Sequence, residues 1–260
     1  NNDRPGILLS SAIEKYANLF GVACGEKNVL FTNNDSAYET AISLYQKGIN
    51  IEAIIDNREE IDSKLIKEAE KNNIKIYKGF TVVNTFGYKR INKISIMQLS
   101  KDGQKVIGSK KSILCDCLGV SGGWTPAVHL FTQSGGKLKF KDKDHVFIPS
   151  NSPSEQISIG ACNGEFSISK IIESIKKNLI QFLDVNKSFY ENLIVKSYPT
   201  KSKRNIWLIP SIKVNGKTKS FVDFQNDATA KDIKLALREG FKSIEHVKRY
   251  TTTGMGTDQG

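Results

Sequence analysis

An alternation of short apolar runs with amphipathic stretches, between residues 28 and 80, constrains the fold of this chain more than any other feature. The run "NVLFTN" (28–33) is followed by "SAYETAISLYQKG" (36–48), whose apolar residues recur at helical spacing, and then by a second run, "INIEAIID" (49–56). A further helical stretch, "IDSKLIKEAEKNN" (61–73), leads to a third run, "IKIYKGF" (74–80). This order of strand, helix and strand predicts βαβ units and a parallel sheet covered by helices.

The bounds of the first helix are suggested by its end residues. Ser36 and Glu39 have the spacing of a capping box, which predicts the helix start, and Gly48 is placed to end the helix. The second run then ends in Asp56.

The pattern changes after residue 80. The segment "TVVNTFGYKRINKISIMQLSKDGQKVIGSKKSILCDCLGVSGG" (81–123) predicts successive antiparallel strands, with a turn at Asp102 and Gly103.

The βαβ pattern raises the question of a bound dinucleotide. Asp56 lies about twenty residues past the first strand, as a ribose-binding acid does. The intervening turn, however, is "TNNDSAY" (32–38), where a phosphate-binding loop needs glycines so that the backbone can approach a pyrophosphate. We therefore expect a Rossmann-like unit kept for structure, with weak nucleotide affinity as the alternative.

Composition argues against two classes of partner. The net charge of +11 is spread along the chain, and we interpret its one basic cluster, "KSYPTKSKR" (196–204), as a solvated linker rather than a nucleic-acid site. The apolar runs are far too short to cross a bilayer, so no membrane partner is expected. Four cysteines without a disulfide pattern favour a reducing, cytoplasmic location.

Side chains with catalytic or metal-binding chemistry are scattered. We expect no catalytic residue and no metal site, because no carboxylate or cysteine stands at catalytic spacing from the three histidines, His129, His145 and His246. Cys115 and Cys117 have no second ligand pair, so a small buried pair on one side of a strand is expected. Trp124 suits either cofactor stacking or a sheet edge, and Arg249 either a flavin phosphate or a helix end.

Two segments resemble motifs of the flavoprotein reductases that contain two dinucleotide-binding domains. "CDCLGVSGGWTPAVHLFTQSGGKLKF" (115–140) is similar to the small-residue segment that closes their first nucleotide domain, and "ISIGACNGEFSISKIIESIKKNL" (157–179) to the strand, turn and helix that follow. Asn163 stands near the usual Asp position. The resemblance implies a partial α/β, Rossmann-like fold and a set of cofactor-binding residues: Gly122, Gly123, Gly160, Ala161, Asn163, Phe166 and Ile168.

The same resemblance implies a division into domains. Residues 1–27 and 112–185 would be parts of the first FAD/NAD-binding-like domain, and 28–111 an inserted NAD-binding-like domain. Residues 186–220 would be linker and strands, and 221–260 a small helical module. The glycine-rich phosphate loop of the first domain would precede the chain, which we therefore interpret as an internal piece of a longer polypeptide.

The C-terminal segment "DATAKDIKLALREGFKSIEHVKRYTTTGMGTDQG" (227–260) resembles the [2Fe–2S] module of bacterioferritin-associated ferredoxin. Asp223 and Gln225 stand near the first pair of cysteine ligands in that module, and Thr257 and Gly260 near the second. A two-iron cluster needs four thiolate-class ligands, and the segment contains no cysteine. We therefore expect no cluster.

Several blocks, among them "SGGWTPAVHL" (121–130), "KSFVDFQND" (219–227) and "GMGTDQG" (254–260), resemble the α subunit of heterotetrameric sarcosine oxidase. That resemblance implies a subunit of an enzyme that converts sarcosine to glycine, hydrogen peroxide and a one-carbon unit passed to tetrahydrofolate. It implies NAD in the α subunit, FMN at the α/β interface, FAD in the β subunit, a folate-binding domain beyond this chain, and β, γ and δ partner subunits. The alternatives are a related proline-type dehydrogenase subunit, or a scaffold with a relic nucleotide site.

Overall fold

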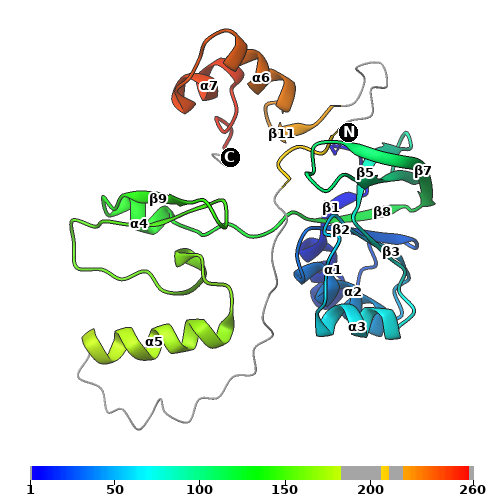
Figure 1. Ribbon diagram of the computed structural model, residues 1–260, viewed down its shortest axis with the longest axis horizontal. Helices are drawn as coiled ribbons and strands as arrows, with labels where there is room; N and C mark the ends of the chain where they lie inside the picture. The colour runs from blue at the N-terminus through cyan, green and yellow to red at the C-terminus, as the bar shows by residue number, and fades with distance from the viewer. Residues whose placement is uncertain (1, 183–205, 211–218, 258–260) are drawn as a thin grey trace. The chain divides into compact units, whose positions relative to one another are not determined.

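The computed structural model describes residues 2–182, 206–210 and 219–257 (Figure 1). The basic cluster at 196–204 and most of the linker expected at 186–220 lie outside this part of the chain. By contacts the chain divides into two compact units, one made of Asn1–Ser121 with Ile206–Gly260 and the other of Gly122–Asn205. Each unit is described by itself.

The first unit is built on a five-stranded sheet whose order is β1-β8-β2-β3-β4. All four strand pairs are parallel, so the parallel sheet predicted from the βαβ pattern is confirmed. The second predicted strand indeed ends at Asp56. The strands are β1 (Ile7–Leu9), β2 (Asn28–Thr32), β3 (Ile51–Asp56), β4 (Ile76–Lys78) and β8 (Cys117–Ser121).

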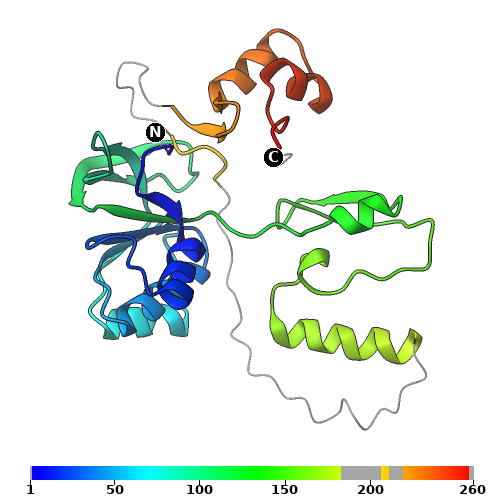
Figure 2. The ribbon, with the colours of Figure 1, turned by 180° about the vertical axis from the view of Figure 1, so that it is seen from behind.

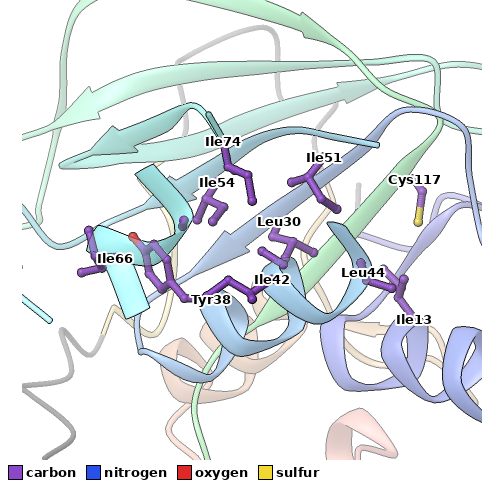
Figure 3. Packing of buried hydrophobic residues seen from close by; sticks show 12 residues of the cluster. Ile13, Leu30, Tyr38, Ile42, Leu44, Ile51, Ile54, Ile66, Ile74 and Cys117 are labelled. Atoms are coloured by element: carbon purple, nitrogen blue, oxygen red, sulfur yellow. The ribbon is translucent and has the colours of Figure 1, made fainter. Parts of the chain in front are cut away.

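Three helices cover one face of this sheet: α1 (Ser10–Phe20), α2 (Ser36–Gln46) and α3 (Lys64–Lys71). Their apolar side chains pack with those of β2 and β3 in one cluster, in which Ile13, Leu30 and Ile54 are almost fully buried (Figure 3). Each such side chain contributes about 1.5–3 kcal/mol on burial, so this cluster is a main source of the unit's stability.

The sequence predicted the C-terminal end of α2 correctly but not its N-terminal start. Gly48 follows the helix with a φ of 75°, a left-handed conformation that glycine adopts without strain, as expected. The predicted capping box of Ser36 and Glu39 is wrong, because the N-cap residue is Asp35 and Ser36 is the first helical residue. The Ser36 hydroxyl donates instead to Oδ1 of Asn34, at 2.6 Å.

The opposite face of the sheet is covered by three antiparallel strands, β5 (Phe80–Phe86), β6 (Lys93–Leu99) and β7 (Val106–Leu114) (Figure 2). Ile94 and Ile96 pack with Val29 and Ile55 of the parallel sheet in a second cluster. The turn predicted at Asp102 and Gly103 joins β6 to β7. These strands and the three helices thus enclose the parallel sheet from both sides.

Strand β8 departs from the sequence prediction, which placed it among the antiparallel strands. It lies parallel between β1 and β2. The chain bends before β8, where the carboxylate of Asp116 accepts hydrogen bonds from the N–H groups of Glu26 and Lys27 at 3.0 and 2.8 Å. Because of this bend Cys117 packs in the helix-side cluster and Cys115 in the opposite one, so the two do not share one side of a strand as expected.

The sheet also crosses the domain bounds expected from the sequence. Strands from residues 1–27 and 112–121 pair within the same sheet as those of 28–111, because β8 returns to bridge β1 and β2. Residues 28–111 therefore share one core with their flanking segments.

The second unit contains α4 (His129–Gln133), the antiparallel pair β9 (Leu138–Lys141) and β10 (Val146–Pro149), the 3₁₀ turn η1 (Gly160–Asn163) and α5 (Ile168–Phe182). The C-terminal segment forms β11 (Phe221–Asp223), β12 (Ala228–Thr229), α6 (Ala230–Arg238) and α7 (Ile244–Thr251). In the described part of the chain, no helix combines the length and apolar character needed to span a bilayer.

Candidate functional site

The turn between β2 and α2 lies at the carboxyl end of the parallel sheet, where ligands of such sheets bind. Its side chains bond to the turn itself. The Thr32 hydroxyl donates to the carbonyl of Asn34 at 2.9 Å and accepts from the Asn34 N–H at 3.0 Å. The Asn34 amide donates to the carbonyl and the hydroxyl of Ser121, at 3.1 and 3.0 Å. These bonds tie the turn to the end of β8.

Asp56, the residue with the position of a ribose-binding acid, is fully buried and is bound by Arg58. The Arg58 guanidinium donates to Asp56 through Nε, at 3.0 Å to Oδ1, and through Nη2, at 2.7 Å to Oδ2. Its Nη1 lies 2.8 Å from Oδ1 of Asp35 in a second ion pair. Arg58 therefore joins two buried carboxylates at neighbouring strand ends, because Asp35 follows β2 and Asp56 is the last residue of β3.

Tyr38 completes this group, since its hydroxyl donates to Oδ2 of Asp56 at 2.9 Å. Burial, followed by the charge of Asp56, raises the pKa of Tyr38, so the phenol stays protonated and remains a donor. Burial alone would lower the pKa of Arg58, but its hydrogen bonds and charge contacts with Asp56 and Asp35 outweigh burial and raise it. The group is thus a charged, internally bonded cluster.

We call Asp35, Tyr38, Asp56 and Arg58 the buried ionic cluster. Its geometry does not fit a dinucleotide, because the carboxylate that would accept a ribose hydroxyl already accepts bonds from Arg58 and Tyr38. The turn above it carries side chains where a pyrophosphate needs bare backbone. Sequence reasoning missed Arg58, although an arginine two residues after the strand-ending acid was a visible signal.

The cofactor-binding residues proposed from the sequence lie in the second unit. Gly160, Ala161 and Asn163 form the turn η1, in which Gly160 has a φ of 82° and is buried while Ala161 and Asn163 are exposed. Asn163 also lines an open hollow together with Phe131 and residues of the 149–158 segment. The turn therefore presents small residues and one amide side chain to the outside.

The two reductase-like motifs meet beside this turn. A Cβ placed on Gly164 would lie 3.7 Å from Cγ of Pro126, so the segment that follows β8 packs against the end of η1. Gly122 and Gly123 begin that segment and are exposed. The structure thus brings the two motifs into contact.

The start of α5 adds the last two proposed residues. Phe166 is half-buried and Ile168, the first helical residue, is exposed. The first turn of α5 contains no acidic residue, but Oε1 of the preceding Glu165 accepts the Ser167 N–H at 2.9 Å. Exposed small residues, an amide and a helix N-terminus fit one edge of a nucleotide, with Glu165 as the group that a phosphate would have to avoid.

The C-terminal module places three of the four positions compared with cluster ligands close together. Asp223 accepts the N–H of Gly254 at 2.8 Å, and Oε1 of Gln225 accepts the N–H of Thr257 at 2.9 Å. The fourth, Gly260, lies outside the described residues. Carboxylate and amide groups engaged in this way do not fit an iron–sulfur cluster. Within the described ranges, no three His, Cys, Asp or Glu side chains gather as a metal site would require.

Comparisons of the C-terminal segment and of the whole chain with known proteins both find sarcosine oxidase. Residues 217–260 match the family model described as the sarcosine oxidase A3 domain. The whole chain aligns with the sarcosine oxidase subunit alpha of Corynebacterium sp. (strain P-1), with 32% identity over 269 residues and 27% of that protein covered. It aligns equally with the sarcosine oxidase subunit alpha of Rhizobium meliloti (strain 1021), at 32% identity and 25% coverage of that protein. The chain thus spans about a quarter of the length of these relatives.

Among solved structures, an L-proline dehydrogenase from P. horikoshii superposes on the whole chain with a TM-score of 0.63 and 19% identity, covering 47% of that protein. At this identity the likeness shows the fold alone, and it agrees with the α/β, reductase-like fold predicted from the sequence. The alignments extend from the first unit through the C-terminal module, and the chain is similar along its full length to the alpha subunits of sarcosine oxidase.

Proposed function

We propose that this chain is part of the alpha subunit of a sarcosine oxidase complex, in which it supplies a nucleotide-binding surface and a subunit interface. The observation that carries the proposal is the alignment of the entire chain with proteins named as that subunit. The complex would oxidise the N-methyl group of sarcosine, releasing glycine and hydrogen peroxide and passing a one-carbon unit to tetrahydrofolate. The β, γ and δ subunits would be its partners.

Within that complex, we place an NAD site on the second unit. It would be formed by Gly122 and Gly123 after β8, by Gly160, Ala161 and Asn163 of η1, and by Phe166 and Ile168 at the start of α5. The contact between Pro126 and the turn, together with the exposure of Ala161 and Asn163, supports this placement. FMN at the α/β interface and FAD in the β subunit belong to the same proposal and would carry the redox chemistry.

For residues 1–121 we propose a structural role. The buried ionic cluster uses the acid that a ribose would need, and the turn between β2 and α2 bonds to itself and to Ser121. This supports the scaffold alternative for this unit while leaving the second unit as the nucleotide site.

The experiment is to express the full-length polypeptide with its partner subunits and to measure hydrogen peroxide formed from sarcosine, together with reduction of an added electron-accepting dye by sarcosine and by proline. NAD released on denaturation is measured in parallel. We expect peroxide with sarcosine and bound NAD. Oxidation of proline but not sarcosine would instead identify a proline-type dehydrogenase.

The location of NAD is tested by Ala161→Glu, which adds bulk and negative charge where the phosphates would approach. The control is Gln133→Glu, which adds the same charge at an exposed position of α4 in the same unit. We expect Ala161→Glu to abolish NAD binding with the complex still assembled, and Gln133→Glu to retain it. Full NAD content in an assembled Ala161→Glu complex would reject the site.

A further inference from the structure

Two loops of the C-terminal module are joined by side-chain hydrogen bonds. One is the turn between β11 and β12, which contains Asp223 and Gln225, and the other follows α7 and contains Gly254 and Thr257. Among the described residues 219–257, the buried apolar side chains are Ala228, Ala236 and Val247, all of them small. Polar side chains supply direct links between the two loops.

The two carboxylate oxygens of Asp223 accept different hydrogen bonds. Oδ1 accepts the N–H groups of Gln225 and Asn226, at 2.8 and 3.1 Å, and so shapes its own turn. Oδ2 accepts the side-chain amide of Asn226 at 3.1 Å and the N–H of Gly254 at 2.8 Å, across 31 residues of chain. An ionised carboxylate only accepts, with about four lone-pair sites, and all four partners here are donors. Asp223 is thus fully bonded in its charged form.

Gln225 makes the second link. Its Oε1 accepts the Thr257 N–H at 2.9 Å and lies 3.3 Å from the Thr257 hydroxyl, which also donates. The amide lies so close to the backbone that a Cβ on Gly256 would be 2.0 Å from Oε1 and 2.9 Å from Cδ of Gln225. A side chain at position 256 would therefore displace Gln225.

We propose that Asp223 and Gln225 form a metal-free clasp that holds residues 253–257 against the β11–β12 turn, and that neutralising Asp223 opens this clasp while the turn survives. The clasp comprises Asp223 and Gln225 as acceptors and Gly254 and Thr257 as donors. The clasp joins two loops whose counterparts carry the cluster ligands in the ferredoxin module that this segment resembles. The module is in this way closed by hydrogen bonds without a redox centre.

The decisive variant is Asp223→Asn in the full-length polypeptide. An asparagine retains one acceptor oxygen, which can keep the turn bonds to Gln225 and Asn226, while its NH₂ group confronts the donor of Gly254. Amide hydrogen exchange is read by mass spectrometry with fragmentation to single residues. We expect exchange at Gly254 to accelerate by about tenfold or more, as for loss of a hydrogen bond to a charged group, with Gln225 and Asn226 within about threefold of the parent.

The matched control is Asp227→Asn, which makes the same charge change in the same turn. Asp227 has a φ of 53°, a conformation that asparagine also tolerates. We expect no change at Gly254. Unchanged exchange at Gly254 in Asp223→Asn, or equal acceleration in the control, would overturn the proposal.

If Asp223→Asn unfolds the module, a second pair of variants tests the clasp through Gln225. Gln225→Ala removes the second link directly, and Gly256→Ala displaces Gln225 without changing it. Both should accelerate exchange at Thr257 by a similar factor and leave α6 unaffected. Thr257 exchange that matches the parent in both variants would contradict the clasp.

Discussion

The hydroxyl oxygen of Tyr38, on the first turns of α2, lies 2.9 Å from Oδ2 of Asp56, at the end of β3, and both side chains are fully buried. This bond joins a helix to the end of a neighbouring strand at the point where a nucleotide would otherwise enter. The phenol and Arg58 together satisfy Asp56, so the carboxyl end of the sheet is closed by the protein's own groups.

Arg58→Met should strongly destabilise the first unit. The substitution leaves Asp35 and Asp56 buried, close together and without their cation, and breaking a buried ion pair in this way costs about 3–5 kcal/mol. The control is Lys67→Met, because Lys67 pairs with Asp62 at 2.9 Å with both side chains about two-thirds exposed, and such pairs contribute less than about 1 kcal/mol. Urea unfolding followed by circular dichroism measures both. Equal losses in the two variants would contradict the assigned role of Arg58.

Cys115 and Cys117 should resist alkylation in the folded protein. Burial raises the pKa of each thiol to about 12, so at pH 8 the thiolate fraction is about one in ten thousand. We expect iodoacetamide to modify both residues only in denaturant, whereas the half-buried Cys162 reacts earlier. Peptide mapping after timed labelling gives the order. Modification of Cys117 at the rate of Cys162 would show that the β8 packing is wrong.

Acid should open the clasp only at a pH below that at which ordinary surface carboxylates are protonated. Hydrogen bonds from the Asn226 side chain and from the N–H groups of Gly254, Asn226 and Gln225 lower the pKa of Asp223 to about 2. A lowered pKa in the folded state means that the stabilisation is complete above about pH 4, the unfolded value, and is lost as the pH falls through about 2.

The measurement is the amide shift of Gly254 by NMR between pH 5 and pH 1.5. We expect a transition near pH 2 in the parent and none in Asp223→Asn. A midpoint near pH 4 in the parent would contradict the bonding of Asp223.

Limited proteolysis of the full-length protein should yield a resistant fragment that includes β1 and extends to β8. The strands β1 and β8 belong to the same sheet as β2, β3 and β4, so a cut near residue 27 or 111 would remove strands from the core. Mass spectrometry of the products identifies the bounds. A stable product limited to residues 28–111 would favour the division expected from the sequence.

The parts of the fold that follow from neighbouring residues were predictable. The βαβ order, the end of β3 at Asp56, the left-handed Gly48 and the turn at Gly103 all depend on local patterns. The place of β8 was not predictable in this way, because an apolar strand of five residues carries no signal for parallel or antiparallel pairing. Only its partners, β1 and β2, decide this.

The candidate site shows the same limit. The sequence indicated that "TNNDSAY" lacks the glycines of a phosphate loop, and the structure adds what replaces the ligand. Arg58 lies two residues from Asp56, but its second partner, Asp35, comes from another loop. In the C-terminal module, ligand replacement was visible in the sequence, whereas the bond from Asp223 to Gly254 spans 31 residues and required the fold.

The insertion of β8 between β1 and β2 has a consequence for the order of events on the ribosome. Strand β2 ends at Thr32 and β8 begins at Cys117, so 85 residues must be added before the two can pair. At about 5–20 residues per second, the interval is roughly 4–17 s. Until then, the edges of β1 and β2 that β8 will occupy stay unpaired on the nascent chain. Closure of the sheet is therefore a late, long-range step, and a chaperone that shields strand edges would act in this window.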